Sequence, residues 1–194
     1  MLDLFINMSY TVFCVIGGAG VDDVPYEIER KFLIRRPDEM WLKTLPDRSE
    51  IVQTYLIEPE GGGRARVRMR TRNGITTCTH TIKRRVNELR AVELEREIDR
   101  EEYDRLLGQA DPTRAPIRKT RCCLPYRGQL FEIDLYPFWD DRAIMEIELE
   151  NEEQPVVLPP EIELIREVSS DRRYSNAALA KWLAETGGKK GWTE

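Results

Sequence analysis

The stretch YEIERKFLI, residues 26–34, alternates charged and apolar side chains. Glu27, Glu29 and Lys31 stand at every second position, with apolar residues such as Ile28 among those between them. Because side chains two residues apart on a β-strand point to the same face, the stretch predicts a strand with one apolar and one charged face. The charged face is either a solvated surface or part of a functional site.

Seven further runs have a strand-like pattern, and most connections between them are short. They cover residues 51–57, 64–72, 76–83, 90–98, 117–124, 129–136 and 143–150. Turn residues occupy several connections, with GGG at 61–63, NG at 73–74 and RG at 127–128. Such connections favour antiparallel hairpins over parallel crossovers, so the sequence predicts eight antiparallel strands.

Helices are predicted to be few and short. One begins near Pro37, and a second follows Asp99, where Glu102 three residues later resembles a capping box. A third covers residues 175–185, where apolar side chains recur at helical spacing.

The composition excludes several classes of protein. The 30 Lys and Arg nearly balance the 35 Asp and Glu, leaving a formal charge of -5, whereas a general nucleic-acid surface needs a basic excess. The 4 cysteines show no CxxC spacing, which argues against a zinc site. We expect a cytoplasmic protein with reduced thiols, no nucleic-acid or membrane partner, and a homodimer as the default oligomer.

The chain length suits one domain, which we place at residues 25–186. Residues 1–24 include the apolar run TVFCVIGGAG, which lacks the basic region of a signal peptide and is too short to span a bilayer. We interpret residues 1–24 as a disordered extension or an over-long start, since Met8 also offers an initiation site, and residues 187–194 as a flexible tail.

Charges of one sign gather strand by strand. Acidic faces are formed by Glu93, Glu95 and Glu97, by Glu132 and Asp134, and by Glu146, Glu148 and Glu150. Basic faces are formed by Arg66, Arg68 and Arg70, by Lys119 and Arg121, and by Lys83. A single face of this kind is more often wetted outer surface, but wetted faces usually mix signs, and neighbouring like charges repel unless something compensates them. We therefore predict an α+β fold: a closed eight-stranded antiparallel β-barrel, or tunnel, with a charged interior and a few short flanking helices.

A charged lumen suits a polyanionic substrate bound together with a metal ion. Buried charges must pair, stay hydrated or hold a charged ligand. Clustered carboxylates suit a hard divalent cation, Mg²⁺ or Mn²⁺, and clustered arginine and lysine suit phosphate oxygens. The pattern therefore indicates a substrate with more than one phosphoryl group.

At these residues the sequence resembles the triphosphate tunnel metalloenzymes, or CYTH superfamily, whose first strand carries ExExK. Here that motif reads Glu27, Glu29 and Lys31. Further matches follow in order: QTYL at 53–56, RVR at 66–68, TIK at 81–83, ELE at 93–95, KTR at 119–121, FEID at 131–134, MEIEL at 145–149 and EVSSDRRYSNAALA at 167–180. The resemblance is greatest to the bacterial inorganic triphosphatases, and it implies divalent-metal-dependent hydrolysis of tripolyphosphate to pyrophosphate and phosphate in an eight-stranded tunnel.

The resemblance also implies a role for each matched residue. Metal ions would be bound by Glu27, Glu29, Glu146 and Glu148, with Asp134 as a further metal-side or water-contacting carboxylate. The triphosphate would be held by Arg66, Arg68, Lys83, Lys119 and Arg121, and the tunnel residues Glu93, Glu95 and Glu132 would support these bases. Lys31 would lie near the attacked phosphorus and orient the water.

Other activities of the same tunnel stay open. They are class IV adenylate cyclase activity, thiamine triphosphatase activity and non-catalytic binding of polyphosphate or nucleotide. We identify no base-recognition element, which favours hydrolysis over cyclisation, and the four matched glutamates disfavour a module that only binds.

Several polar residues fall outside the motifs. His80 has the opposite parity to Lys83, so we expect it in the core or at the rim, not in catalysis. We expect Glu97, Glu150 and Arg70 at the tunnel mouth or on the surface. Arg172 and Arg173 precede the last helix, where they either cover one tunnel end or lie on the surface.

Overall fold

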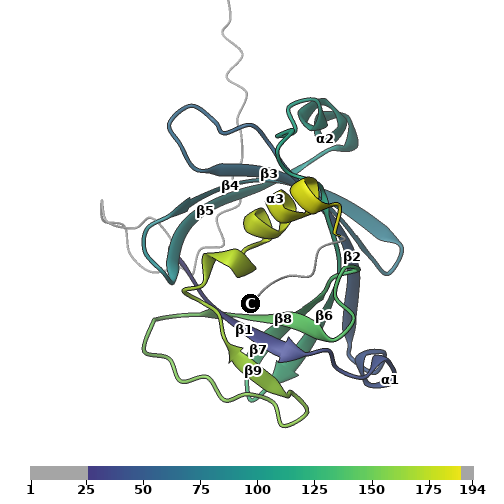
Figure 1. The fold of residues 1–194 in the computed structure, drawn as a ribbon, viewed down its shortest axis with the longest axis vertical. Coiled ribbons are helices and arrows are strands. Elements are labelled where there is room, and N and C mark those ends of the chain that lie inside the picture. The colour runs from purple at the N-terminus through teal and green to yellow at the C-terminus, as the bar shows by residue number, and fades with distance from the viewer. Residues whose placement is uncertain (1–25, 189–194) are drawn as a thin grey trace, which may run out of the picture.

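The computed structural model describes residues 26–188, and its strands close into a barrel (Figure 1). Its first eight strands are β1 (Tyr26–Arg35), β2 (Asp47–Tyr55), β3 (Arg64–Arg72), β4 (Ile75–Arg85), β5 (Arg90–Ile98), β6 (Ile117–Tyr126), β7 (Gln129–Leu135) and β8 (Arg142–Leu149). They are hydrogen-bonded in the order β5-β4-β3-β2-β6-β7-β8-β1, and β1 pairs again with β5. Every pairing is antiparallel, so the predicted closed eight-stranded barrel is confirmed.

The predicted helices are also present. They are α1 (Glu39–Leu42), α2 (Arg100–Leu107) and α3 (Asn176–Thr186), and a 3-10 turn, η1 (Arg172–Tyr174), precedes α3. Asp99 caps α2 by accepting from the backbone N–H of Glu102, as half of a capping box requires, but the Glu102 side chain instead contacts Arg96. Within residues 26–188 no helix is long and apolar enough to cross a membrane. The predicted extension at 1–24 and most of the predicted tail, 189–194, lie outside the described residues.

A ninth strand, β9 (Leu164–Glu167), has no counterpart in the sequence prediction. It is only four residues long and pairs with β1 at Phe32–Ile34, whereas β5 pairs with β1 at Tyr26–Ile28. The other edge of β1 is taken by β8. β1 therefore leaves β5 near Ile28 and takes β9 as its next neighbour, which leads the following segment to the mouth of the barrel.

Two hairpin turns carry the register of the barrel. Asn73 and Gly74 connect β3 to β4 with φ of 50° and 78°, and Arg127 and Gly128 connect β6 to β7 with φ of 50° and 76°. Positive φ at both central residues is the geometry that matches the twist of antiparallel strands. Both turns were predicted from the sequence, and both fix which side chains face inward.

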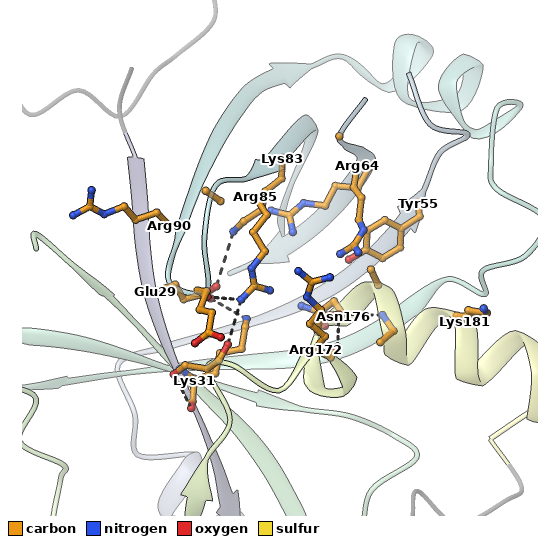
Figure 2. Close-up of a pocket in the computed structure, with 18 of the residues that line it drawn as sticks. Glu29, Lys31, Tyr55, Arg64, Lys83, Arg85, Arg90, Arg172, Asn176 and Lys181 are labelled. Carbon is orange, nitrogen blue, oxygen red and sulfur yellow. Dashed lines mark hydrogen bonds and ion pairs between the residues drawn. The ribbon is translucent and has the colours of Figure 1, made fainter. Parts of the chain in front are cut away.

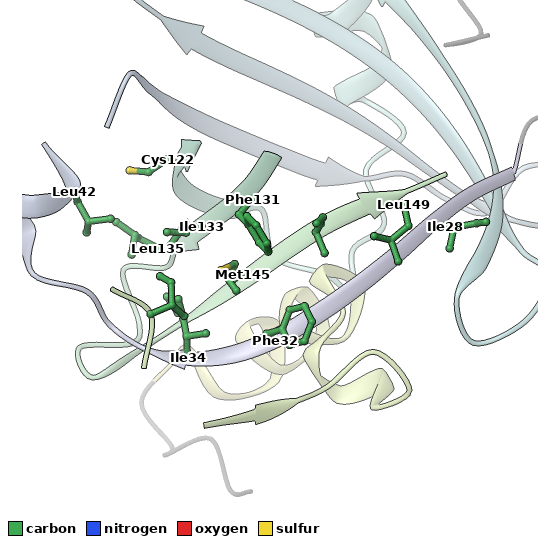
Figure 3. Packing of buried hydrophobic residues seen from close by; sticks show 13 residues of the cluster. Ile28, Phe32, Ile34, Leu42, Cys122, Phe131, Ile133, Leu135, Met145 and Leu149 are labelled. Atoms are coloured by element: carbon green, nitrogen blue, oxygen red, sulfur yellow. The ribbon is translucent and has the colours of Figure 1, made fainter. Parts of the chain in front are cut away.

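Apolar residues on the outer face of the barrel are covered by helices and loops. In one cluster, side chains from β1, β6, β7 and β8, such as Phe32 and Met145, pack with Leu42 of α1 (Figure 3). In a second cluster, Val67 and Ile98 pack with residues of α2. These two clusters agree with the predicted charged interior and flanking helices, because they place apolar strand faces on the outside of the barrel.

The inner face is also apolar, but only at one end of the barrel. There Leu33, Ile117 and Ile144, which share the parity of the charged residues, are fully buried against Leu179 and other residues of α3. α3 lies across this end of the barrel (Figure 1). The Tyr136 hydroxyl and the Asn176 side-chain oxygen are 2.7 Å apart, so a hydrogen bond connects the first turn of α3 to Tyr136, the residue that follows β7. The lumen is thus partly filled by apolar side chains beside α3 and charged along the rest.

Candidate active site

The charged lumen contains a cavity of about 450 Å³, which we call the inner cavity. Its wall carries every predicted site residue except Asp134: Glu27, Glu29, Lys31, Arg66, Arg68, Lys83, Glu93, Glu95, Lys119, Arg121, Glu132, Glu146 and Glu148. These residues come from β1, β3, β4, β5, β6, β7 and β8. Strand parity alone therefore brings distant charges to one wall, because the closed barrel turns one face of each strand inward.

Arg66 and Arg68 on β3 present donors that have no acceptor. The Arg66 Nη2 donates to Glu93 at 2.9 Å, and the Arg68 Nη1 lies 3.9 Å from Glu95. The Nε atoms of both guanidinium groups are buried and have no hydrogen-bond partner among the described residues. Burial and the adjacent Arg66 charge lower the pKa of Arg68. Buried donors of this kind cost free energy unless an acceptor fills the space, so the pair is suited to an anion.

Lys31 on β1 lies between two carboxylates. Its Nζ is 3.0 Å from Glu29 and also forms an ion pair with Glu146 on β8. Burial lowers the pKa of the Lys31 ammonium, but Glu146 and Glu29 outweigh that effect, and the net shift is upward. Lys31 therefore stays protonated at neutral pH and can donate hydrogen bonds, but it does not act as a base.

Lys119 and Arg121 on β6 are both held by Asp134. The Asp134 carboxylate is fully buried, accepts from Arg121 Nε and Nη2 at 2.7 Å each, and forms an ion pair with Lys119. Burial and the Arg121 charge lower the pKa of Lys119 to about 8. Asp134 is thus a buried partner of both cations. Its contacts favour a role in positioning Lys119 and Arg121 over the metal-side or water-contacting role expected from the sequence. Glu146, 2.8 Å from Arg121 Nη2, is likewise committed to cations.

Glu27 faces two other carboxylates as well as Lys83. Its carboxylate forms an ion pair with Lys83 Nζ, which is also 3.2 Å from Glu93. Burial raises the pKa of Glu27 to about 7, with the charges of Glu93 and Glu29 adding to the effect and Lys83 opposing it. Burial and the neighbouring carboxylates therefore favour the protonated form of Glu27, whereas Lys83 favours its ionised form, as a bound cation would.

Glu148 also lines the inner cavity, near the carboxylates of Glu132 and Glu29. Desolvation and the charges of Glu132 and Glu29 raise its pKa, and within residues 26–188 its carboxylate makes no ion pair. Across residues 26–188, no three or more Asp, Glu, His or Cys side chains are arranged closely enough to hold a metal ion. The donors themselves are carboxylate oxygens, which suit a hard divalent cation, and Glu27 and Glu29 are free for one only when their lysine partners turn to another anion.

A second cavity, of about 490 Å³, opens beside the inner cavity at the α3 end; we call it the rim cavity. The two cavities share Glu29, Lys31, Arg66, Lys83 and Asn176 in their walls. Figure 2 shows Arg64, Arg85 and Arg172 extending into this space. Motif matching missed Arg64 and Arg85, although strand parity was a sufficient signal, since Arg64 shares a face with Arg66 and Arg85 with Lys83.

The remaining polar residues divide between mouth and surface. Arg172 lines the rim cavity, whereas Arg173 is exposed and pairs with Asp171 at 2.8 Å. Arg70 lines the inner cavity and donates to Ser49 at 3.0 Å. Glu97 and Glu150 are exposed, and His80 lies on the outer side of β4 near Arg96 and Glu102.

The closed antiparallel barrel with a charged lumen defines a tunnel protein whose chemistry is directed at a polyanion. A sequence model of the CYTH domain matches residues 25–177, and the chain belongs to this family. It is 32% identical over 157 residues to an inorganic triphosphatase of Nitrosomonas europaea, covering 79% of this chain and 96% of that protein.

Two solved structures are also similar. A crystal structure of an inorganic triphosphatase has a TM-score of 0.49 at 29% identity, over 80% of this chain and 97% of that chain. A protein of Pyrococcus horikoshii has a TM-score of 0.49 at 20% identity, over 65% of this chain and 80% of that chain.

Proposed function

We propose that this protein hydrolyses a triphosphate in its tunnel, with inorganic tripolyphosphate preferred over ATP and thiamine triphosphate. The observation that carries the proposal is the pair of arginines, Arg66 and Arg68, that line the inner cavity and whose buried Nε donors have no acceptor in the described part of the chain. Phosphoryl oxygens would supply those acceptors. The 32% identity to an inorganic triphosphatase supports the same substrate class.

The basic residues of the wall would bind the substrate and keep it in one orientation. Arg66, Arg68, Lys83, Lys119 and Arg121 come from three strands, so a chain of phosphoryl groups along the lumen would contact several of them at once. Asp134 fixes Arg121 with two hydrogen bonds, and this fixed geometry lowers the cost of ordering on binding. Positioning and charge neutralisation are the main contributions a protein makes to phosphoryl transfer.

In the hydrolysis step, water adds to a terminal phosphorus and the bond from that phosphorus to the bridging oxygen breaks. Orthophosphate and pyrophosphate are the products, and the proton from water passes to a phosphate oxygen or to solvent. Lys31, held protonated by Glu29 and Glu146, would donate to the phosphoryl oxygens and to the attacking water. No protein group is required as a base in this scheme.

Glu27, Glu29 and Glu148 would hold a divalent metal ion, Mg²⁺ or Mn²⁺, with Glu132 as a neighbouring carboxylate. When bound, such an ion neutralises charge on the phosphoryl oxygens and lowers the pKa of its water ligands. The substrate would free these carboxylates, because Lys31 and Lys83 could turn from Glu29 and Glu27 to the phosphate. Glu146 is less suited to the ion, since both of its oxygens contact cations of the chain.

A substrate panel tests the proposal. Purified protein is given tripolyphosphate, ATP and thiamine triphosphate with Mg²⁺ or Mn²⁺, and orthophosphate, pyrophosphate and cyclic AMP are measured. We expect orthophosphate release to be fastest from tripolyphosphate. Cyclic AMP with pyrophosphate from ATP would instead identify a cyclase, and binding without turnover of any substrate would identify a binding module.

A matched pair of variants tests whether Arg66 of the inner cavity binds the substrate. Arg66→Gln removes a donor from the inner cavity, and Arg118→Gln removes the same charge from the exposed outer side of β6. We expect Arg66→Gln to lower kcat/KM for tripolyphosphate by roughly 100-fold, as loss of a charge-assisted contact in a phosphoryl site does. Equal activity of the two variants would remove Arg66 from the site.

A further inference from the structure

The rim cavity is far more basic than the inner cavity. Its wall includes nine Lys and Arg side chains (Lys31, Arg64, Arg66, Lys83, Arg85, Arg90, Arg114, Arg172 and Lys181) against three Glu (Glu29, Glu58 and Glu88). The inner cavity has seven of each sign, and the whole chain carries a formal charge of -5. A positive excess in one cavity of an acidic protein is therefore local, and it attracts anions to the α3 end of the tunnel.

Three of these cations, Arg64, Arg85 and Arg172, have no carboxylate within ion-pair distance in the described part of the chain. The others at the rim are already paired: Arg90 with Glu152 at 2.6 Å, Arg114 with Asp111 at 3.0 Å and Lys181 with Glu185 at 3.8 Å. Arg85 donates only to backbone carbonyls, those of Asn87, Glu88 and Ser169. We call Arg64, Arg85 and Arg172 the rim arginines.

The rim arginines are also close enough to affect one another. They come from β3, β4 and η1, and Figure 2 shows their guanidinium groups directed into the same space. Burial lowers the pKa of Arg85, and the charges of Arg172 and Arg64 lower it further. These three like charges come from separate elements, are exposed to solvent and have no carboxylate at ion-pair distance in the described part of the chain, an arrangement that an anion would stabilise.

The rim arginines are continuous with the inner cavity. Lys31, Arg66 and Lys83 line both cavities, so an anion gripped in the inner cavity can extend past them to the rim. A linear condensed phosphate satisfies this geometry, because each added unit carries further charge and acceptor oxygens along the same chain. Arginine is well matched to such oxygens through its forked donors.

We propose that Arg64, Arg85 and Arg172 form a subsite for an additional phosphoryl group, so that the tunnel favours linear polyphosphates of four or more units over tripolyphosphate. The proposal rests on the proposed function for its substrate class. It assigns the chain-length preference to the rim arginines, while the inner cavity holds the three phosphoryl groups common to all these substrates.

Two double variants that each lose two positive charges test this subsite, through the dependence of their activity and affinity on polyphosphate chain length. The test protein carries Arg85→Gln and Arg172→Gln. The control carries Arg84→Gln and Arg173→Gln, which removes two charges from adjacent positions outside both cavity walls. For each protein kcat/KM is measured with tripolyphosphate, tetrapolyphosphate and ATP, and binding of the two polyphosphates to the metal-free protein is measured by calorimetry.

We expect wild type and control to bind and turn over tetrapolyphosphate better than tripolyphosphate, and the test protein to lose that preference by roughly tenfold, about 1.4 kcal/mol. Equal losses with both substrates, or no loss with either, would overturn the subsite. A loss confined to ATP would assign the rim to a nucleotide and overturn it as well. Calorimetry distinguishes failure of the subsite from failure of the proposed function. Even if the protein hydrolyses none of these substrates, tighter binding of tetrapolyphosphate than of tripolyphosphate still tests whether the rim arginines bind a fourth phosphoryl group.

Discussion

Glu29 on β1 and Glu148 on β8 lie directly opposite each other across the strand pair. Like charges at facing positions of an antiparallel pair destabilise a sheet, yet both side chains line the inner cavity. Lys31 lies 3.0 Å from Glu29, but within residues 26–188 the Glu148 carboxylate has no ion-pair partner. The repulsion between Glu29 and Glu148 therefore lowers the stability of the fold at a position that is suited to a cation.

The variant Glu148→Gln should separate stability from activity. Without divalent cations it should raise the free energy of unfolding by about 0.2–1 kcal/mol, because a repulsion between neighbouring carboxylates is removed. With Mg²⁺ it should lower triphosphate turnover on the order of 100-fold or more, since the loss of a metal ligand exceeds that of a supporting residue. Urea denaturation with EDTA and phosphate release with Mg²⁺ measure the two effects.

Glu150→Gln is the matched control, because Glu150 follows on the same face of the chain and is exposed like Glu148, but does not line the cavity. It should change neither quantity. If Glu148→Gln destabilised the ion-free protein, the carboxylate would have a partner that stabilises it, and the repulsion argument would be wrong.

Stability of the ion-free protein should fall as the pH rises. The pKa of Glu27 is raised to about 7 by burial and by Glu93 and Glu29, above its ordinary value of 4.5. A raised folded-state pKa means that the stabilisation is fully present below about 4.5 and is lost as the pH rises through 7. Between pH 5 and pH 8 the loss attributable to Glu27 should be on the order of 2 kcal/mol.

The measurement is urea denaturation in EDTA at both pH values, for wild type and for Glu27→Gln. The variant cannot ionise at this position, so its stability should depend less on pH than that of wild type. Parallel pH profiles for the two proteins would contradict the prediction, and Mg²⁺ added to wild type at pH 8 should restore part of the difference.

Much of the fold follows from strand parity, and the site residues follow from it too. The alternation of Glu27, Glu29 and Lys31 with apolar residues predicted a charged strand face, and the gathering of like charges on other strands predicted that such faces turn inward, because a closed barrel leaves each strand only two faces. Parity did not distinguish Leu33 from Lys31, which share a face but lie in an apolar layer and a charged layer respectively. That difference depends on where α3 packs, which is a long-range contact.

The unpredicted elements have the same origin. β9 is four residues long, and its pairing with β1 depends on β5 having diverged from that edge. The burial of Asp134 against Lys119 and Arg121 could not be predicted either, because parity gives the strand face on which a side chain lies but not how deeply that side chain is buried. Sequence pattern therefore predicts which charges meet, and tertiary packing decides which of them remain open to a ligand.

The turn at Arg127 should be improvable. Arg127 has a φ of 50°, in the left-handed region that costs a non-glycine residue about 1–2 kcal/mol, whereas the equivalent turn residue Asn73 belongs to a type that tolerates it. Arg127→Asn should raise the free energy of unfolding by about 0.5–1 kcal/mol and the Tm by roughly 2–4 °C. Differential scanning calorimetry measures the change.

The reciprocal variant Asn73→Arg should lower the Tm by a similar amount. A lower Tm for Arg127→Asn would show that the contact of Arg127 with the Tyr126 ring, 5.5 Å from the guanidinium carbon to the ring centroid, contributes more than the backbone strain costs.

Asp134→Asn tests whether this residue positions cations or holds a metal ion. The change leaves Lys119 and Arg121 buried beside a neutral amide, and breaking a buried ion pair from one side costs about 3–5 kcal/mol. We expect that loss in urea denaturation with EDTA, together with a higher KM for tripolyphosphate, because the two cations are no longer fixed. Glu132→Gln is the control, since Glu132 also contacts Arg121 but is only partly buried and leaves Asp134 in place. Native stability of the Asp134→Asn variant, combined with a selective loss of metal dependence, would instead make Asp134 a metal ligand.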